Sequence, residues 1–151
     1  MKIVDANVLL YAVNEEALHH EPVRRWWDAA LSGDEPIGLC WTVLLAFLRI
    51  ATHPRAFARP LEPEQALAVV AAWLGHPNVR VVTETDTHWD ILRSLLVATG
   101  TAGNLTTDAH LAALAIARGA WLVSCDADFA RFPHLRWENP CDPAAGRSRS
   151  R

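Results

Sequence analysis

Apolar residues occur along the chain in short runs that alternate with longer amphipathic stretches. The short runs have the length of strands and lie at residues 2–4, 36–40, 79–82, 120–124 and 135–139. The longer stretches carry apolar residues at helical spacing, and several end at a glycine or before a proline. The helices that this pattern predicts span approximately residues 6–13, 21–32, 42–52, 62–74, 86–99 and 107–118.

Strands that alternate with helices indicate an α/β fold, with a mainly parallel sheet and helices on both faces. The sequence has no internal repeat and no interior linker, so residues 1–140 are expected to form one domain. Beyond Pro140 the segment "CDPAAGRSRSR" is polar and low in complexity. That composition is typical of a disordered tail, and we predict one over residues 141–151.

The composition is that of a domain that folds by packing alone. Of the 151 residues, 51% are hydrophobic, which is enough for a sizeable core without cross-links. The three cysteines, Cys40, Cys125 and Cys141, are odd in number and irregularly spaced. This argues against a disulfide framework and against a zinc site, and we therefore expect a reduced, cytoplasmic protein.

Charge and hydropathy limit the classes of partner. The formal net charge is −3, so nucleic acid would have to be bound through a local basic patch rather than by the whole surface. The longest strongly apolar uncharged run, from Pro36 to Leu48, is too short to cross a bilayer. No association with a membrane is therefore expected.

Acidic residues directly follow two of the predicted strands. Asp5 follows the first strand, and Asp126 and Asp128 follow the fourth. Ligands bind open parallel sheets beyond the carboxyl ends of the strands. These carboxylates are therefore expected to meet at one edge of the sheet, where a ligand would lie.

Asp108 lies near the start of an apolar helix. Helical periodicity places it on the same side as Leu111 and Ala115, the packed face of the helix. His110 is expected to point away from that face, toward solvent. An isolated carboxylate on a packed face would be costly, because burial disfavours charge. The helix N-terminus offsets part of that cost, and a bound cation would offset much more.

Each acid alone has a simpler explanation. Asp5 and Asp108 could each cap a helix or lie in its first turn, and Asp126 could cap the turn after its strand. Several carboxylates at one sheet edge, however, repel each other unless a cation lies between them. Oxygen-only ligands suit Mg²⁺ or Mn²⁺. The sequence has no competing His/Cys ligand spacing and no glycine-rich phosphate loop.

Four segments together resemble a known family. They are "IVDANVLLYA", "FLRIATHPRAF", "GNLTTDAHLAALAIARGAWLVSCDADFARF" and "LRWENP". Their order and spacing are similar to those of PIN domains, and more narrowly of the VapC ribonuclease toxins, over residues 1–140. The resemblance implies a PIN-like α/β/α sandwich with a mainly parallel central sheet. It also implies RNA cleavage with Mg²⁺ or Mn²⁺, neutralisation by a VapB-type antitoxin, and a homodimer.

The resemblance assigns roles to individual residues. Asp5, Asp108 and Asp126 match the family's catalytic acids and would also be metal ligands. Asp128, in the turn "DADF", matches a further metal ligand. The positions that would orient carboxylates or water are Asn7, Thr107 and Ser124.

One position departs from the family pattern. The family usually has a Glu in its middle helix, and Ala46 stands there in "LLAFLRIAT". One acid of the usual set is thus missing, and Asp128 or water could take its place. With one ligand fewer, metal affinity and activity are the properties expected to be weaker.

Basic residues within and after the middle helix could hold RNA outside the acidic pocket. Arg49, Arg55 and Arg59 are the candidates, because contacts to phosphates supply much of the affinity for nucleic acid. Each of them could equally be an ordinary solvated surface residue.

Three functions compete on the sequence alone. The first is a metal-dependent endoribonuclease toxin. The second is a non-catalytic PIN-like module that binds RNA or an antitoxin, since the Glu is missing. The third is a phosphoryl-transfer enzyme of another acidic α/β fold, suggested by "CDADF". That motif lies too near the C-terminal end of the chain for the rest of such a domain to follow.

Overall fold

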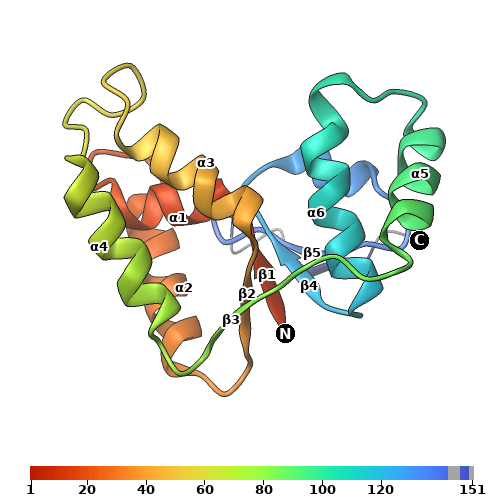
Figure 1. Cartoon of the computed structure of the whole chain (residues 1–151), viewed down its shortest axis with the longest axis horizontal. Helices are drawn as coiled ribbons and strands as arrows, with labels where there is room; N and C mark the ends of the chain where they lie inside the picture. Colours follow the sequence, from red (N-terminus) through yellow and green to blue (C-terminus); the bar gives the residue numbers. More distant parts are fainter. Residues whose placement is uncertain (143–146, 150–151) are drawn as a thin grey trace.

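Within the residues that the computed structural model describes, 1–142 and 147–149, six strands form one central sheet (Figure 1). The strand order is β3-β2-β1-β4-β5-β6, and every neighbouring pair is parallel except β5 and β6. The strands are β1 Lys2–Val4, β2 Ile37–Leu39, β3 Val79–Val81, β4 Trp121–Val123, β5 Arg136–Glu138 and β6 Arg147–Arg149.

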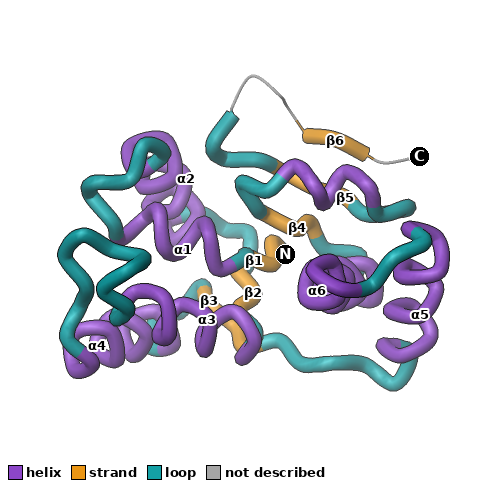
Figure 2. Tube along the Cα trace, turned by 90° about the horizontal axis from the view of Figure 1, so that it is seen from above, coloured by secondary structure: helices purple, strands orange, loops and turns teal. Residues whose placement is uncertain are grey.

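Helices α1 to α4 lie on one side of the sheet, and α5 and α6 lie on the other, so the molecule has three layers (Figures 1 and 2). This arrangement confirms the predicted α/β/α sandwich. The helices are α1 Ala6–Val13, α2 His20–Ser32, α3 Trp41–Ala51, α4 Pro63–Leu74, α5 His88–Thr99 and α6 Thr106–Ala117. In the described part of the chain, no helix has the length and apolar character needed to cross a bilayer.

The register of β1 and β4 brings the ends of the two strands together. Val4 pairs with Val123, and both are fully buried because helices cover both faces of the sheet. The backbone N–H of Asp5 then donates to the carbonyl of Val123 at 2.9 Å. The residues that follow the two strands, Asp5 and Ser124, therefore lie side by side at the carboxyl edge of the sheet.

The structure describes part of the segment that was predicted to be a disordered tail. Arg147–Arg149 form β6, which pairs antiparallel with β5. Without β6, β5 would be an edge strand with one row of unpaired backbone groups, and pairing satisfies those groups. The rest of the predicted tail beyond Asp142 lies outside the described residues.

The prediction that the cysteines form no disulfide is also wrong. Cys125 is bonded to Cys141, while Cys40 is free and buried. The two bonded cysteines follow β4 and β5, which are adjacent and parallel. Their Cα atoms consequently lie 5.4 Å apart, within the usual span of a disulfide. Spacing along the sequence gave no sign of this pairing, because it depends on which strands are neighbours.

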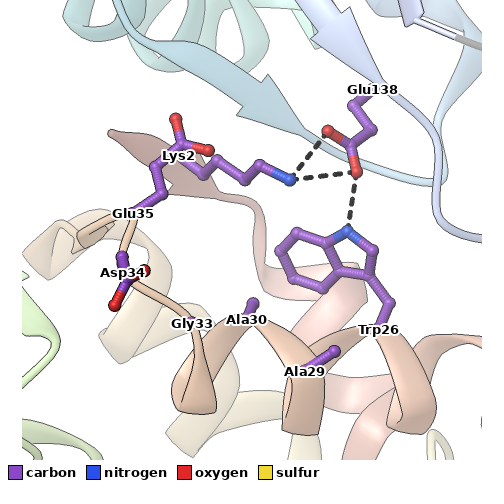
Figure 3. A pocket seen from close by; sticks show the side chains of 8 residues that line it. All are labelled: Lys2, Trp26, Ala29, Ala30, Gly33, Asp34, Glu35 and Glu138. Carbon is purple, nitrogen blue, oxygen red and sulfur yellow. Dashed lines mark hydrogen bonds and ion pairs between the residues drawn. The ribbon is translucent and has the colours of Figure 1, made fainter.

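A pocket between α2 and the sheet is built around one ion pair (Figure 3). Its volume is 310 Å³. The Glu138 carboxylate lies 3.0 Å from Lys2 Nζ and accepts a 2.7 Å hydrogen bond from Trp26 Nε1. These contacts join α2 to β1 and β5. None of the predicted acids lines this pocket, so it is not the candidate active site.

Candidate active site

Asp5 is held in one orientation by three hydrogen bonds. One carboxylate oxygen accepts from the backbone N–H of Ala6 at 2.6 Å, so Asp5 does cap α1. The other oxygen accepts from Ser124 Oγ at 2.7 Å and from Asn7 Nδ2 at 2.9 Å. Burial raises the pKa of Asp5, the hydrogen bonds from Ser124 and Ala6 lower it, and the charge of Asp126 raises it; the balance is upward.

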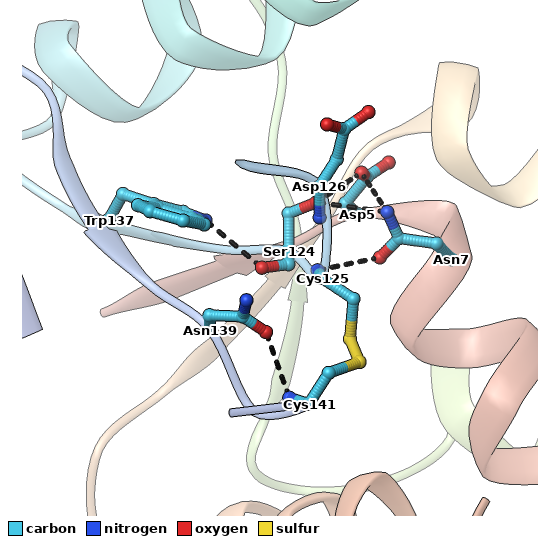
Figure 4. The surroundings of a disulfide bond; sticks show 8 residues. All are labelled: Asp5, Asn7, Ser124, Cys125, Asp126, Trp137, Asn139 and Cys141. Carbon is cyan, nitrogen blue, oxygen red and sulfur yellow. Dashed lines mark hydrogen bonds between the residues drawn. A yellow bond between two sulfur atoms is a disulfide. The ribbon is translucent and has the colours of Figure 1, made fainter. Parts of the chain in front are cut away.

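Ser124 connects the two strand ends through its hydroxyl group (Figure 4). Besides donating to Asp5, this hydroxyl accepts from Asn7 Nδ2 at 2.9 Å and from the Asp126 backbone N–H at 3.0 Å. Asn7 also accepts from the Cys125 backbone N–H at 3.2 Å. Asn7 and Ser124 thus occupy the supporting positions that the family resemblance implied, and they fix Asp5 relative to the loop that carries Asp126.

Asp108 lies within the electrostatic reach of the other three acids. It is half-buried in the first turn of α6. Burial, followed by the negative charges of Asp5, Asp126 and Asp128, raises the pKa of Asp108 to about 6. Four carboxylates from three parts of the chain therefore converge, as the sequence predicted.

The loop after β4 carries the remaining two acids. Asp126 accepts a 2.8 Å hydrogen bond from the backbone N–H of Asp128, so it caps the 3₁₀ turn η2 Ala127–Arg131. Asp128 lies toward the rim, about half exposed, with Arg131 4.0 Å from its carboxylate. Asp126 therefore both caps this turn and contributes negative charge to the acid cluster.

The chemistry of this donor set fits a hard divalent cation. All four groups are carboxylates, and their mutual repulsion is the condition that a cation relieves. Among the described residues, no group of three or more His, Cys, Asp or Glu side chains is arranged so that it could hold a metal ion. A cation at these carboxylates would therefore be held by few protein oxygens, in an open site. Such a site suits Mg²⁺, which keeps several of its waters and uses few protein carboxylates.

Three of the other predicted site residues are exposed and separate from this cluster. Thr107 is exposed in the first turn of α6, and no hydrogen bond involves its side chain in the described part of the chain. Arg59 forms a 3.3 Å ion pair with Glu16, and its side chain is 90% exposed. Arg55 is exposed in the loop after α3. The structure thus does not join these three side chains to the carboxylates.

Arg49 shares one face of α3 with Thr42 and Ala46. Thr42, Ala46 and Arg49 are spaced four and three residues apart, so they form one stripe along the helix. At the start of the stripe, Thr42 Oγ1 lies 3.2 Å from His110 Nε2 of α6. The N-terminal end of this stripe therefore contacts α6.

The expectation that His110 faces solvent is wrong. Its ring lies 3.0 Å from His88 Nε2 of α5 and contacts Thr42 of α3. Burial lowers the pKa of His110, His88 lowers it as well, and Glu84 acts in the opposite direction. Periodicity of one helix could not reveal this contact, because it depends on how α3, α5 and α6 pack together.

The central place of Ser124 leads to a prediction about stability. Ser124→Ala removes a fully buried hydroxyl and leaves Asp5, Asn7 and the Asp126 N–H without a shared partner. We expect a loss of about 1–3 kcal/mol in the free energy of unfolding, measured by urea denaturation. The pKa of Asp5 should also rise further, because the Ser124 hydrogen bond lowers it.

A matched control for this substitution is Ser94→Ala on α5, because Ser94 is exposed. If both variants lose the same small amount of stability, Ser124 does not organise the strand ends as its hydrogen bonds indicate.

Comparison with known proteins places the whole arrangement in a family. The PIN domain family model matches residues 2–135. This chain is a PIN domain. It is 53% identical over 140 residues to Ribonuclease VapC37 of Mycobacterium tuberculosis, covering 93% of this chain and 97% of the relative. It is 45% identical to Ribonuclease VapC33 of the same organism, covering 93% and 98%. The chain therefore belongs to the VapC ribonucleases among PIN domains.

Solved structures agree with this fold. VapBC2 from Rickettsia felis, bound to a DNA fragment of its promoter, gives a TM-score of 0.67 at 19% identity and covers 91% of this PIN domain and 97% of that chain. The Mycobacterium tuberculosis VapC20 toxin, described as cleaving the sarcin–ricin loop, gives a TM-score of 0.64 at 19% identity. The match covers 86% of this chain and 93% of that chain. The predicted PIN-like fold and the predicted class, a VapC-type ribonuclease of toxin–antitoxin systems, are confirmed.

Proposed function

We propose that this PIN domain is an endoribonuclease toxin that hydrolyses RNA phosphodiester bonds with Mg²⁺ or Mn²⁺. The observation that carries the proposal is the convergence of Asp5, Asp108 and Asp126 at one sheet edge, with Asp108 protonating at a pKa of about 6. Relatives at 53% and 45% identity are named ribonucleases, which supports the same reaction.

The residues have distinct roles in this proposal. Asp5, fixed by Ser124 and Asn7, is the preorganised metal ligand. Asp108 and Asp126 complete the metal ligands and the catalytic acids, and Asp128 contributes from the rim. When bound there, a divalent cation supplies an activated water and neutralises charge that builds up on the phosphate. Thr107, exposed beside Asp108, is proposed to orient water.

RNA needs basic groups beside such an acidic pocket. Arg49 is the strongest candidate, because it shares the α3 stripe with Thr42, which contacts α6. Arg55 and Arg59 lie farther along, in the loop after α3, and would bind more distant phosphates. Each such contact should make RNA binding sensitive to salt.

The partners follow from the relatives rather than from contacts in this chain. Several solved structures of this fold are titled as VapBC complexes, including that from Salmonella typhimurium bound to DNA. We therefore include a VapB-type antitoxin as the partner that neutralises the toxin, and a cytoplasmic setting. A homodimer is also part of the proposal. Its support is the pair Trp41 and Leu45, one turn apart on α3 and 52% and 59% exposed.

The test is cleavage of RNA by purified protein with Mg²⁺, with Mn²⁺, and with EDTA. Cleavage that requires the metal and stops when a VapB-type antitoxin is added is the expected result. The alternative is a non-catalytic module that binds RNA or antitoxin, and Ala46 in place of the usual Glu is the observation that favours it. Binding of RNA without cleavage at any metal concentration would establish that alternative.

A further inference from the structure

The disulfide lies directly beside the candidate active site (Figure 4). Cys125 stands between Ser124, which binds Asp5, and Asp126. Its backbone N–H donates to Asn7, which in turn donates to Asp5. Cys125 is therefore one peptide away from each of two site residues, and its main chain belongs to their hydrogen-bond network.

The other half of the disulfide belongs to a separate segment. Cys141 follows β5, and its backbone N–H donates to the Asn139 side chain at 2.9 Å. The sulfur–sulfur bond thus joins the loop after β4 to the segment after β5, 16 residues later in the sequence. The closed ring contains both Asp126 and Asp128. When the bond is present, this loop is anchored covalently as well as through Ser124.

We propose that Cys125 and Cys141 form a reversible redox pair that controls how firmly Asp126 is held and thereby regulates metal binding and RNA cleavage. This inference rests on the proposed function. The oxidised protein has the better organised acid loop, because one end of the loop is bonded to the segment that follows β5. The reduced protein keeps the same ligands on a less constrained loop.

The chemistry requires a mild oxidant, and a small-molecule disulfide is sufficient. One cysteine thiolate attacks that disulfide, forms a mixed disulfide and releases one small thiol. The other cysteine then attacks the mixed disulfide, forms the Cys125–Cys141 bond and releases the second small thiol. Two protein thiols are oxidised, the small disulfide is reduced to two thiols, and the two protons of the protein thiols leave with the products.

The proposed cytoplasmic setting favours a reversible bond over a permanent one. Disulfides in the cytosol, where present, are usually transient and catalytic or redox-sensing. The core of this PIN domain also needs no cross-link, since apolar side chains from the sheet and its helices form one buried cluster. The bond also lies beside the proposed metal ligands, where making or breaking it can affect metal binding.

The experiment compares the full chain after treatment with oxidised glutathione and after treatment with a phosphine reductant. Thiols are counted by alkylation and mass spectrometry, and the melting temperature is titrated with Mn²⁺ in the absence of RNA. We expect one reactive thiol in the denatured oxidised protein, that of Cys40, and three after reduction. The Mn²⁺ concentration at the midpoint should be about tenfold lower for the oxidised protein. This is the low end of the change in metal affinity, about tenfold, that alterations next to metal ligands cause. RNA cleavage should follow the same midpoints.

Two variants separate this effect from general damage by oxidant. The double variant Cys125→Ser, Cys141→Ser should behave like the reduced protein under both treatments, because it has neither thiol to attack the small disulfide, whereas Cys40→Ala should keep the full redox response. Equal Mn²⁺ midpoints in the two states, or three reactive thiols after oxidation, would overturn the proposal. If neither state cleaves RNA but the Mn²⁺ midpoints differ, the redox control stands and the proposed ribonuclease fails. If Mn²⁺ shifts neither state, the redox control fails together with the metal site.

Discussion

Replacing Asp108 with Asn is expected to abolish RNA cleavage while leaving the fold intact. Asn keeps the size of the side chain but removes a negative metal ligand from a group of four carboxylates. We expect the cleavage rate to fall by more than about 100-fold, since changes to the outer shell of a metal site alone cost 10- to 100-fold. Growth inhibition in cells should be lost in parallel.

The same substitution should change how stability depends on pH in the absence of metal. Asp108 has a folded-state pKa of about 6, above its ordinary value of 3.8. The folded state therefore binds this proton more tightly than the unfolded state. The resulting stabilisation is complete below about pH 3.8 and is lost as the pH rises through about 6. Asp108→Asn should thus be more stable than wild type at pH 7 in EDTA, and the difference should shrink toward pH 4.

The measurement is the melting temperature in EDTA between pH 4 and 7.5 for both proteins. Asp90→Asn is the matched control, because Asp90 is an exposed acid in the first turn of α5. That variant should show neither the gain at pH 7 nor the loss of cleavage. Cleavage by Asp108→Asn at the wild-type rate, in a folded preparation, would remove Asp108 from the site.

The acid cluster was predictable because parallel strands impose it. Once the chain alternates strand and helix, the carboxyl ends of the strands lie along one edge, and Asp5 and Asp126 must follow them there. Asp108 was recognised by its place on a packed helix face. The family resemblance added Asn7 and Ser124, whose hydrogen bonds agree with supporting roles.

Features that depend on which elements are neighbours could not be derived from the sequence. The Cys125–Cys141 bond depends on β4 and β5 being neighbours in the sheet. The order of strands in a sheet cannot be read from their order along the chain. The contact of His88 with His110 likewise needs the packing of α5 against α6. The short strand β6 was missed because "RSR" has the composition of a tail, and only the free edge of β5 gives it a partner.

Replacing Ala46 with Glu should make the stability of this PIN domain strongly dependent on metal. Ala46 is half-buried on the α3 stripe that begins at Thr42, which contacts His110 of α6. A carboxylate at this position would add repulsion to a group in which the pKa values of Asp5 and Asp108 are already raised. In EDTA the variant should therefore melt at a lower temperature than wild type. With Mg²⁺ or Mn²⁺ bound, the added charge is paired, and the gain in stability should exceed that of wild type.

The decisive measurement is a metal titration of the melting temperature and of the cleavage rate for both proteins. Restoring a ligand should move both midpoints to lower metal concentration, because the open site of wild type depends on few carboxylates. Ala68→Glu is the matched control: it makes the same substitution at an exposed alanine of α4. That variant should shift neither midpoint, because its carboxylate is solvated. If Ala46→Glu instead destabilises the protein equally with and without metal, and its cleavage midpoint does not move, Ala46 is an ordinary packing residue. The metal site would then be complete with the four aspartates alone.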